Sequence, residues 1–148
     1  MGKVLVVYHT LSGNTEKMAN AVAEGAESIA GTEVMLKKAL DATLEDFTEC
    51  DGVALGSADY FSYIAGGLKE FFDRTFYPSR GKVDGKPYVA FTTGGGGGDT
   101  AMAVLDRIAG GAFKLTKLVD GVSAGGKISD SDFNACKEIG KKLAEAVK

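Results

Sequence analysis

KVLVVYHTLSGNT, residues 3–15, is the stretch of sequence that decides the fold. Its first part, Lys3–Tyr8, is a continuous apolar run rich in β-branched residues, which is typical of a strand covered on both faces. A polar loop follows, and from Met18 to Ile29 apolar residues recur every three or four positions, which marks one face of a helix. The stretch therefore predicts a buried strand that leads through a short loop into an amphipathic helix.

The same strand-then-helix pattern repeats along the rest of the chain. Further strands are expected over Glu33–Lys38, Gly52–Ser57, Pro87–Thr93 and Leu115–Val119 or somewhat beyond. Helical stripes are expected over Met18–Ile29, Ile64–Phe76, Ala101–Ile108 and Phe133–Val147, with a short helical turn at Leu44–Phe47. Gly31 should stop the first helix, and Pro78 lies beyond the end of the helix at Ile64–Phe76. Asp130 or Ser131 should cap the last helix. Five β-then-α units predict an α/β fold, with helices on both faces of a parallel sheet, in a single domain over residues 1–148.

The composition excludes several classes of function. With 148 residues, 45% hydrophobic and 25% charged, the chain is an ordinary globular sequence rather than a disordered one. A net charge of −3 argues against nucleic-acid binding, which needs a basic surface, and the apolar run near the N-terminus is too short for a membrane span. Cys50 and Cys136 lack metal-ligand spacing, and a single histidine excludes a histidine-rich metal site. Two lone cysteines without an export signal indicate a reducing compartment, so we expect a cytoplasmic protein.

Three loops of unusual composition follow the first, third and fourth expected strands, at the sheet edge where α/β proteins bind ligands. In the first, Thr10–Thr15, hydroxyl groups can bond phosphate oxygens, Gly13 lets the backbone bend, and the following helix directs free N–H groups at an anion. The loop contains no lysine or arginine, which suits a monophosphate held by neutral donors. The alternative is a plain Ser/Asn/Thr cap of the helix.

Together the three loops resemble the flavodoxin family. Thr10–Thr15 followed by Glu16–Ala19 is similar to that family's phosphate loop. Gly56–Phe61, running into Leu68–Arg74, resembles its second segment, and Thr92–Gly96 resembles its glycine-rich third loop. The resemblance covers nearly the whole chain and implies a flavodoxin-like doubly wound sheet of five parallel strands in the order 2-1-3-4-5, with FMN as cofactor.

The resemblance also implies a role for each matching residue. The phosphate would be held by Thr10, Leu11, Ser12, Gly13, Asn14 and Thr15; one side of the flavin ring would be lined by Ser57, Ala58, Asp59, Tyr60 and Phe61, and the other by Thr93, Gly94 and Gly95. Tyr60 or Phe61 would stack on the ring, and the alternative for both aromatic residues is core packing.

Three departures from the family pattern lie at the ring end of the site. Ala58 stands where the family usually has proline, and Asp59 where threonine is usual. A carboxylate beside the flavin should lower its reduction potential by charge repulsion; alternatively, Asp59 caps the helix that follows. The run Gly94–Gly98 replaces the aromatic residue of many electron-carrying flavodoxins, which predicts an open and mobile face.

The sequence therefore predicts an FMN-binding redox protein, in which the flavin performs the chemistry and no catalytic acid, base or nucleophile is required. Its partners would be a redox protein or a small quinone or nicotinamide substrate. The shortness of the chain favours an electron carrier, whereas the glycine-rich loop favours an NAD(P)H-dependent quinone or flavin reductase. An alternative of another class is a binding module of the same fold without FMN.

Overall fold

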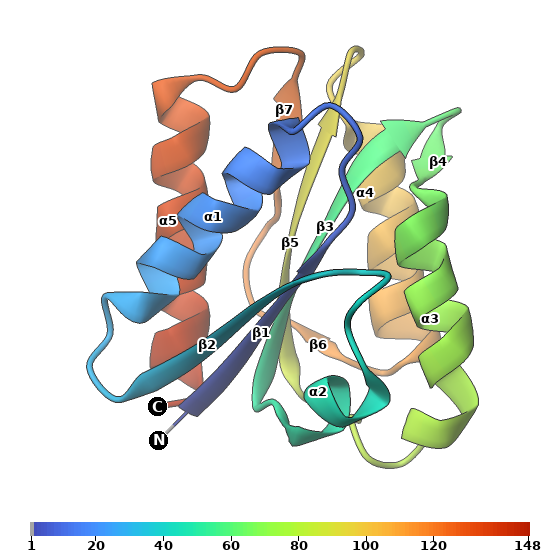
Figure 1. Cartoon of the computed structure of the whole chain (residues 1–148), viewed down its shortest axis with the longest axis vertical. Helices are drawn as coiled ribbons and strands as arrows, with labels where there is room; N and C mark the ends of the chain where they lie inside the picture. The colour runs from blue at the N-terminus through green and yellow to red at the C-terminus, as the bar shows by residue number, and fades with distance from the viewer. Residues whose placement is uncertain (1) are drawn as a thin grey trace.

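A parallel sheet forms the centre of the protein, which a computed structural model describes over residues 2–148 (Figure 1). Its strands are β1 (Gly2–Tyr8), β2 (Thr32–Lys38), β3 (Gly52–Tyr60), β5 (Pro87–Gly94) and β6 (Thr116–Lys117), in the spatial order β2-β1-β3-β5-β6, and β7 (Val122–Gly125) also pairs with β5. This arrangement confirms the expected strand order and the α/β fold. Met1, the first residue of the expected domain, lies outside the described residues.

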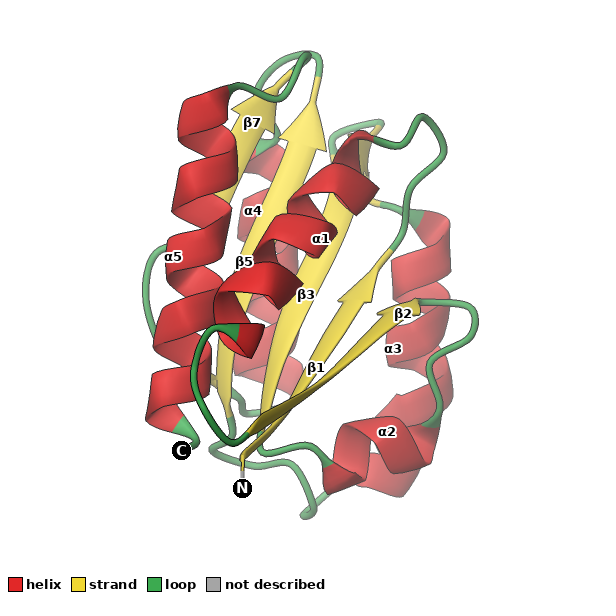
Figure 2. Ribbon diagram, turned by 60° about the vertical axis from the view of Figure 1, so that its left-hand side comes forward, coloured by secondary structure: helices red, strands yellow, loops and turns green. Residues whose placement is uncertain are grey.

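Helices cover both faces of the sheet (Figures 1 and 2). On one face lie α1 (Asn14–Glu27) and α5 (Asp130–Ala146); on the other lie α2 (Leu44–Glu49), α3 (Gly66–Ser79) and α4 (Asp99–Asp106), which continues into the π-helix η1 (Arg107–Ala112). Each face has its own apolar core, and within residues 2–148 no helix combines the length and apolarity that a bilayer crossing requires.

Strand β1 lies between the two cores. Val4 and Val6 pack under α1 and α5, while Leu5 and Val7 belong to the opposite core, and all four side chains are fully buried. Alternate residues of a strand point to opposite faces, so a strand covered on both sides has to be apolar throughout. The expectation for Lys3–Tyr8 is thereby confirmed.

Helices α1 and α5 approach each other closely at two glycines. A Cβ atom at Gly25 would overlap the Lys137 carbonyl oxygen, and one at Gly140 would overlap the Val22 carbonyl oxygen. The missing side chains let the two backbones meet, so glycine is required at both positions for steric reasons.

The expected fifth strand is divided. Instead of one strand at Leu115–Val119, two short strands, β6 and β7, pair with successive parts of β5. Asp120 and Gly121, two poor strand formers, lie in the interruption, and at Gly121 a Cβ atom would come 2.8 Å from the Ala90 carbonyl oxygen.

Several boundary predictions are wrong. Helix α1 ends at Glu27, before Ile29, and β3 continues past Ser57 to Tyr60. Ile64 lies in the short strand β4 (Tyr63–Ile64), which is antiparallel to β3, rather than in the next helix. Pro78 lies inside the last turn of α3, where it removes one backbone donor, and the helix ends at the next residue, Ser79. The cap of α5 is Ser129, which forms a reciprocal capping box with Asp132.

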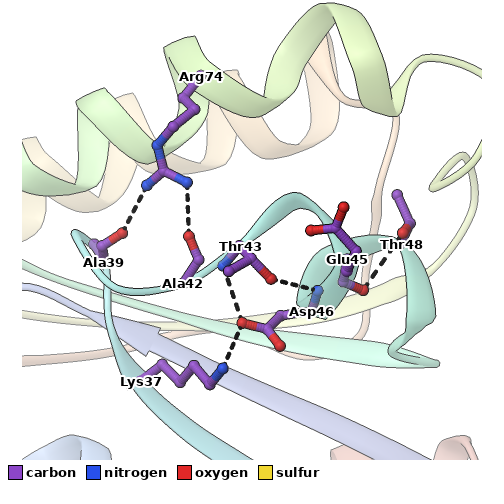
Figure 3. Close-up of polar contacts among 8 residues, drawn as sticks. All are labelled: Lys37, Ala39, Ala42, Thr43, Glu45, Asp46, Thr48 and Arg74. Atoms are coloured by element: carbon purple, nitrogen blue, oxygen red, sulfur yellow. Dashed lines mark hydrogen bonds and ion pairs between the residues drawn. The ribbon is translucent and has the colours of Figure 1, made fainter.

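Arg74 joins α3 to the connection between β2 and α2 (Figure 3). Its guanidinium donates to the carbonyl oxygens of Ala42 (2.7 Å) and Ala39 (3.1 Å), two residues that are almost wholly buried. Its bond to Glu70, one turn earlier on α3, lies at the surface. Arg74 thus satisfies two backbone acceptors at a point where no strand or helix does so.

Candidate functional site

The three loops identified in the sequence meet at the carboxyl edge of the sheet, at the ends of β1, β3 and β5 (Figure 1). They enclose a pocket of about 160 Å³. Its lining includes eight of the expected site residues, Ser12, Asn14, Ala58, Asp59, Tyr60, Thr93, Gly94 and Gly95, together with Gly126. The structure therefore brings together residues from all three segments.

The first loop leaves the start of α1 open to a ligand. The Thr10 hydroxyl accepts a hydrogen bond from the Gly13 backbone N–H (2.9 Å), and Gly13 adopts a left-handed φ of 98° as the N-cap residue. Gly13 itself has no side chain with which to cap the next N–H groups of α1. Because the first N–H groups of a helix have no partner within it, those of α1 remain available as donors to an anion. Of the alternative interpretation, a Ser/Asn/Thr cap, the structure shows only the Thr10 bond to the N-cap N–H.

A buried hydrogen bond joins the first loop to the third. The hydroxyl oxygens of Thr15 and Thr93 lie 2.9 Å apart, and both residues are buried. The bond fixes the start of α1 against the end of β5, so the two sides of the pocket are held together within the protein itself.

The second loop is a tight hairpin. Tyr60 pairs with Tyr63, and the two residues between them, Phe61 and Ser62, have φ angles of 60° and 59°. A two-residue loop with both angles positive follows the right-handed twist of the strands, although such angles are costly for residues other than glycine. Tyr60 lines the pocket, whereas Phe61 projects fully into solvent.

Ser57 shapes this loop rather than lining the pocket. Its side chain is completely buried; its hydroxyl donates to the Ala58 carbonyl oxygen (2.7 Å) and accepts from the Ala65 N–H (2.8 Å). The expected ring contact at Ser57 is therefore replaced by a bond that fixes where the hairpin returns to α3.

Asp59 caps a helix, but not the helix expected. Its carboxylate accepts a hydrogen bond from the Ala101 N–H in the first turn of α4 (3.3 Å), whereas α3, the next helix in the chain, begins at Gly66, and its N-cap residue Ala65 makes no side-chain cap bond. Asp59 also lines the pocket. Its negative charge thus lies beside the ligand site and faces the positive end of α4.

The glycine run is held at both ends. The Gly97 N–H donates to the Gly94 carbonyl oxygen (2.9 Å), and the Thr92 hydroxyl donates to the Gly98 carbonyl oxygen (2.9 Å). Within the run, Gly95 and Gly96 alone combine open space around the Cα atom with a φ outside the left-handed region. The expected open face is therefore confined to the middle of the run, where a second hollow of about 240 Å³ shares Asp59, Gly94 and Gly95 with the first.

A fourth loop, which sequence reasoning missed, completes the pocket. The Asn14 side-chain amide donates to the Gly126 carbonyl oxygen (3.3 Å), and the Gly126 N–H donates to the Gly94 carbonyl oxygen (3.0 Å). Gly126 lies in the turn after β7, with a left-handed φ of 65°. A glycine pair after a strand, Gly125–Gly126, is the pattern that could have revealed it, but the expected strand ended before this turn.

Several other polar side chains at this edge have structural roles. Tyr8 donates to the Glu16 carboxylate (2.7 Å), and burial together with this bond raises the pKa of Tyr8 to about 12. The His9 ring packs edge-on to Tyr60, and burial lowers its pKa. Leu11, expected at the phosphate, is 78% exposed at the rim.

Both cysteines lie away from this pocket and are buried. Burial raises the pKa of Cys50 to about 11 and that of Cys136 to about 12. Both thiols therefore stay protonated near neutral pH and are poor nucleophiles.

Comparisons with known proteins agree with this geometry. The family described as NADPH-dependent FMN reductase matches residues 30–129. A flavodoxin of Aquifex aeolicus is 40% identical over 162 aligned positions, which cover 99% of this chain and 88% of that protein. An NAD(P)H dehydrogenase (quinone) of Rhodopseudomonas palustris is 30% identical over 193 positions, covering 98% of this chain and 96% of that protein. The solved structure of a flavodoxin from the domain Archaea superimposes with a TM-score of 0.82 at 28% identity and covers 98% of both chains. The chain therefore belongs to the flavodoxin-like family of FMN-binding proteins.

Proposed function

We propose that this FMN-binding redox protein is an electron carrier, with the pocket at the carboxyl edge of the sheet as its FMN site. The observation that favours a carrier is that the loops between the strands and helices are short. The alignment with the quinone dehydrogenase has 193 positions against a chain of 148 residues, so at least 45 positions of that relative have no counterpart here. The hairpin after β3 has a loop of two residues, and such short connections offer little material for a nicotinamide pocket.

The start of α1 fits the phosphate group of FMN. Among residues 2–148, no side chain bonds its first-turn N–H groups, and the hydroxyls of Thr10, Ser12 and Thr15 lie on the same loop. A dianionic phosphate is stabilised there by hydrogen bonds and by the positive end of the helix dipole. The Thr10 hydroxyl already holds Gly13 in its left-handed conformation, so the loop is preorganised before the ligand arrives.

The ring end of the site lies between the hairpin and the glycine run. Tyr60 offers an aromatic wall on one side, and Gly94 and Gly95 offer backbone without side chains on the other. Bound FMN supplies the electron-transfer chemistry itself. The protein residues bind and orient the cofactor, and the Asp59 carboxylate disfavours additional negative charge on it.

The second candidate is an NAD(P)H-dependent quinone or flavin reductase. The family match to FMN reductases favours it, as does the second hollow beside Gly94–Gly96, which leaves room for a small acceptor. In either case the partner is a redox protein or a small quinone or nicotinamide. We place the protein in the cytoplasm because its two cysteines are unpaired.

Reconstitution with FMN followed by two assays tests the proposal. We expect the protein to bind one FMN, to accept electrons in separable one-electron steps during anaerobic titration, and to oxidise neither NADH nor NADPH at a significant rate with a quinone present. Sustained nicotinamide oxidation would replace the carrier with the reductase. A colourless protein that takes up no added FMN would overturn both and leave a binding module.

A further inference from the structure

The loop proposed to bind the phosphate supplies no positively charged side chain to balance the charge of that phosphate. Residues 10–15 contain no lysine or arginine, and the next residue, Glu16, brings a carboxylate into the first turn of α1. A phosphate monoester at neutral pH carries close to two negative charges. Neutral donors and a helix dipole of about half an elementary charge only partly compensate these charges.

The turn after β7 brings a lysine to this loop from the far end of the sequence. Gly126 accepts a hydrogen bond from Asn14 (3.3 Å), the first residue of α1, and lines the pocket with Ser12 and Asn14. The next residue is Lys127, which is exposed. Within residues 2–148, no acidic side chain lies within ion-pair distance of Lys127. Its ammonium group is therefore free to pair with an anion from outside the chain.

The other lysine near the start of α1 faces elsewhere. Lys17 lines a groove between α1 and α5 together with Glu24, Asp130 and Lys137, and Lys137 pairs with Glu24 there (3.3 Å). This groove shares no lining residue with the pocket that holds Ser12 and Gly126. The backbone contact to the phosphate loop thus singles out Lys127 among the cations near this end of the molecule.

We propose that Lys127 forms an ion pair with the phosphate of FMN and makes the site selective for the phosphorylated flavin over riboflavin. This inference rests on the proposed FMN site. The Asn14–Gly126 bond holds the residue next to Lys127 against the first residue of α1. The ion pair is exposed, so it should strengthen binding moderately and weaken as salt is added.

Titration of the apoprotein with FMN and with riboflavin, followed by flavin fluorescence, tests the proposal. We expect Lys127→Gln to raise the Kd for FMN about three- to tenfold and to leave that for riboflavin unchanged, with Lys127→Arg close to the native protein. The FMN affinity of Lys127→Gln should also depend less on salt concentration. The matched control is Lys82→Gln, which removes an exposed lysine from the loop between α3 and β5, at the opposite edge of the sheet.

The outcomes separate this inference from the proposed function. An unchanged Kd for FMN in Lys127→Gln overturns the role of Lys127, and so does an equal loss for FMN and riboflavin, which would indicate a damaged turn. An equal loss in Lys82→Gln also overturns it, because the effect would then arise from net charge alone. If the native protein binds neither flavin, the proposed function itself fails.

Discussion

The buried bond between Thr15 and Thr93 offers the sharpest test of how the site is assembled. Thr15→Val or Thr93→Val alone keeps the side-chain shape but leaves the other hydroxyl buried without its partner, since the two residues are only 1% and 5% exposed. Such an unsatisfied group costs about 1–3 kcal/mol of unfolding free energy, whereas replacing both partners with apolar groups of the same shape is close to neutral. The two single costs add to at least about 2 kcal/mol, so the double variant should be more stable than their sum predicts by at least about 2 kcal/mol.

Urea unfolding of the apoprotein measures this coupling, with Thr116→Val on the exposed strand β6 as a control that should change the stability by less than about 0.5 kcal/mol. FMN titration of the same variants adds a second readout, because only Thr15 is proposed to bind the phosphate. Thr15→Val should weaken FMN binding more than Thr93→Val does. If the destabilisation of the double variant equals the sum of the two single destabilisations within about 0.5 kcal/mol, the pairing of the two hydroxyls is refuted.

Three further variants test other contacts. Asp59→Asn keeps an oxygen that can cap α4 but removes the charge, so potentiometric titration should show a midpoint potential higher by about 20–60 mV; an unchanged potential would contradict the proposed repulsion. A lysine at position 74 cannot reach both backbone carbonyls, so Arg74→Lys should lower the unfolding free energy by about 1–3 kcal/mol in thermal or urea unfolding. The control Glu70→Gln removes an exposed ion pair and should change the unfolding free energy little. Equal effects of the two variants would argue against the backbone bonds. Gly140→Ala should destabilise the protein by at least about 1–3 kcal/mol because its Cβ atom would overlap the Val22 carbonyl, whereas Gly66→Ala, in open space, should be neutral or stabilising in the same assay.

Features that depend on contiguous residues could be predicted from the sequence. Lys3–Tyr8 could be predicted as a strand because uninterrupted apolar residues suit a strand buried on both faces, and the structure buries Val4–Val7 completely. The loop before α1 and its left-handed glycine could be predicted because the hydroxyl residues, Gly13 and the following helix are contiguous. Strand order followed from the family resemblance, and the structure agrees with it.

The features that could not be predicted depend on contacts between distant segments. The cap from Asp59 to Ala101 spans 42 residues, and the bond from Asn14 to Gly126 spans 112 residues. No periodicity along the chain encodes such a pair. The division of the last strand shows the same limit: Asp120 and Gly121 interrupt a ladder whose two parts are set by their partner β5.

Two helices, α1 and α4, begin at the edge of the sheet where the pocket lies. The groups bonded to their N-terminal N–H groups differ, and this difference implies how the cofactor is oriented. Both α1 and α4 follow a left-handed glycine, Gly13 and Gly98, and neither of these N-cap residues offers a side-chain bond. The positive end of α4 is nevertheless already engaged by the Asp59 carboxylate. At α1 the first-turn carboxylate, Glu16, bonds the Tyr8 hydroxyl, and among residues 2–148 no acidic side chain bonds the first backbone N–H groups. A dianion approaching this edge is therefore repelled at α4 and attracted at α1. We expect the phosphate of FMN to lie at α1, with its ring directed toward the hairpin and the glycine run. We therefore expect Asp59 to orient the cofactor as well as to lower its potential, because its carboxylate occupies the helix start at which a phosphate would bind in the wrong direction.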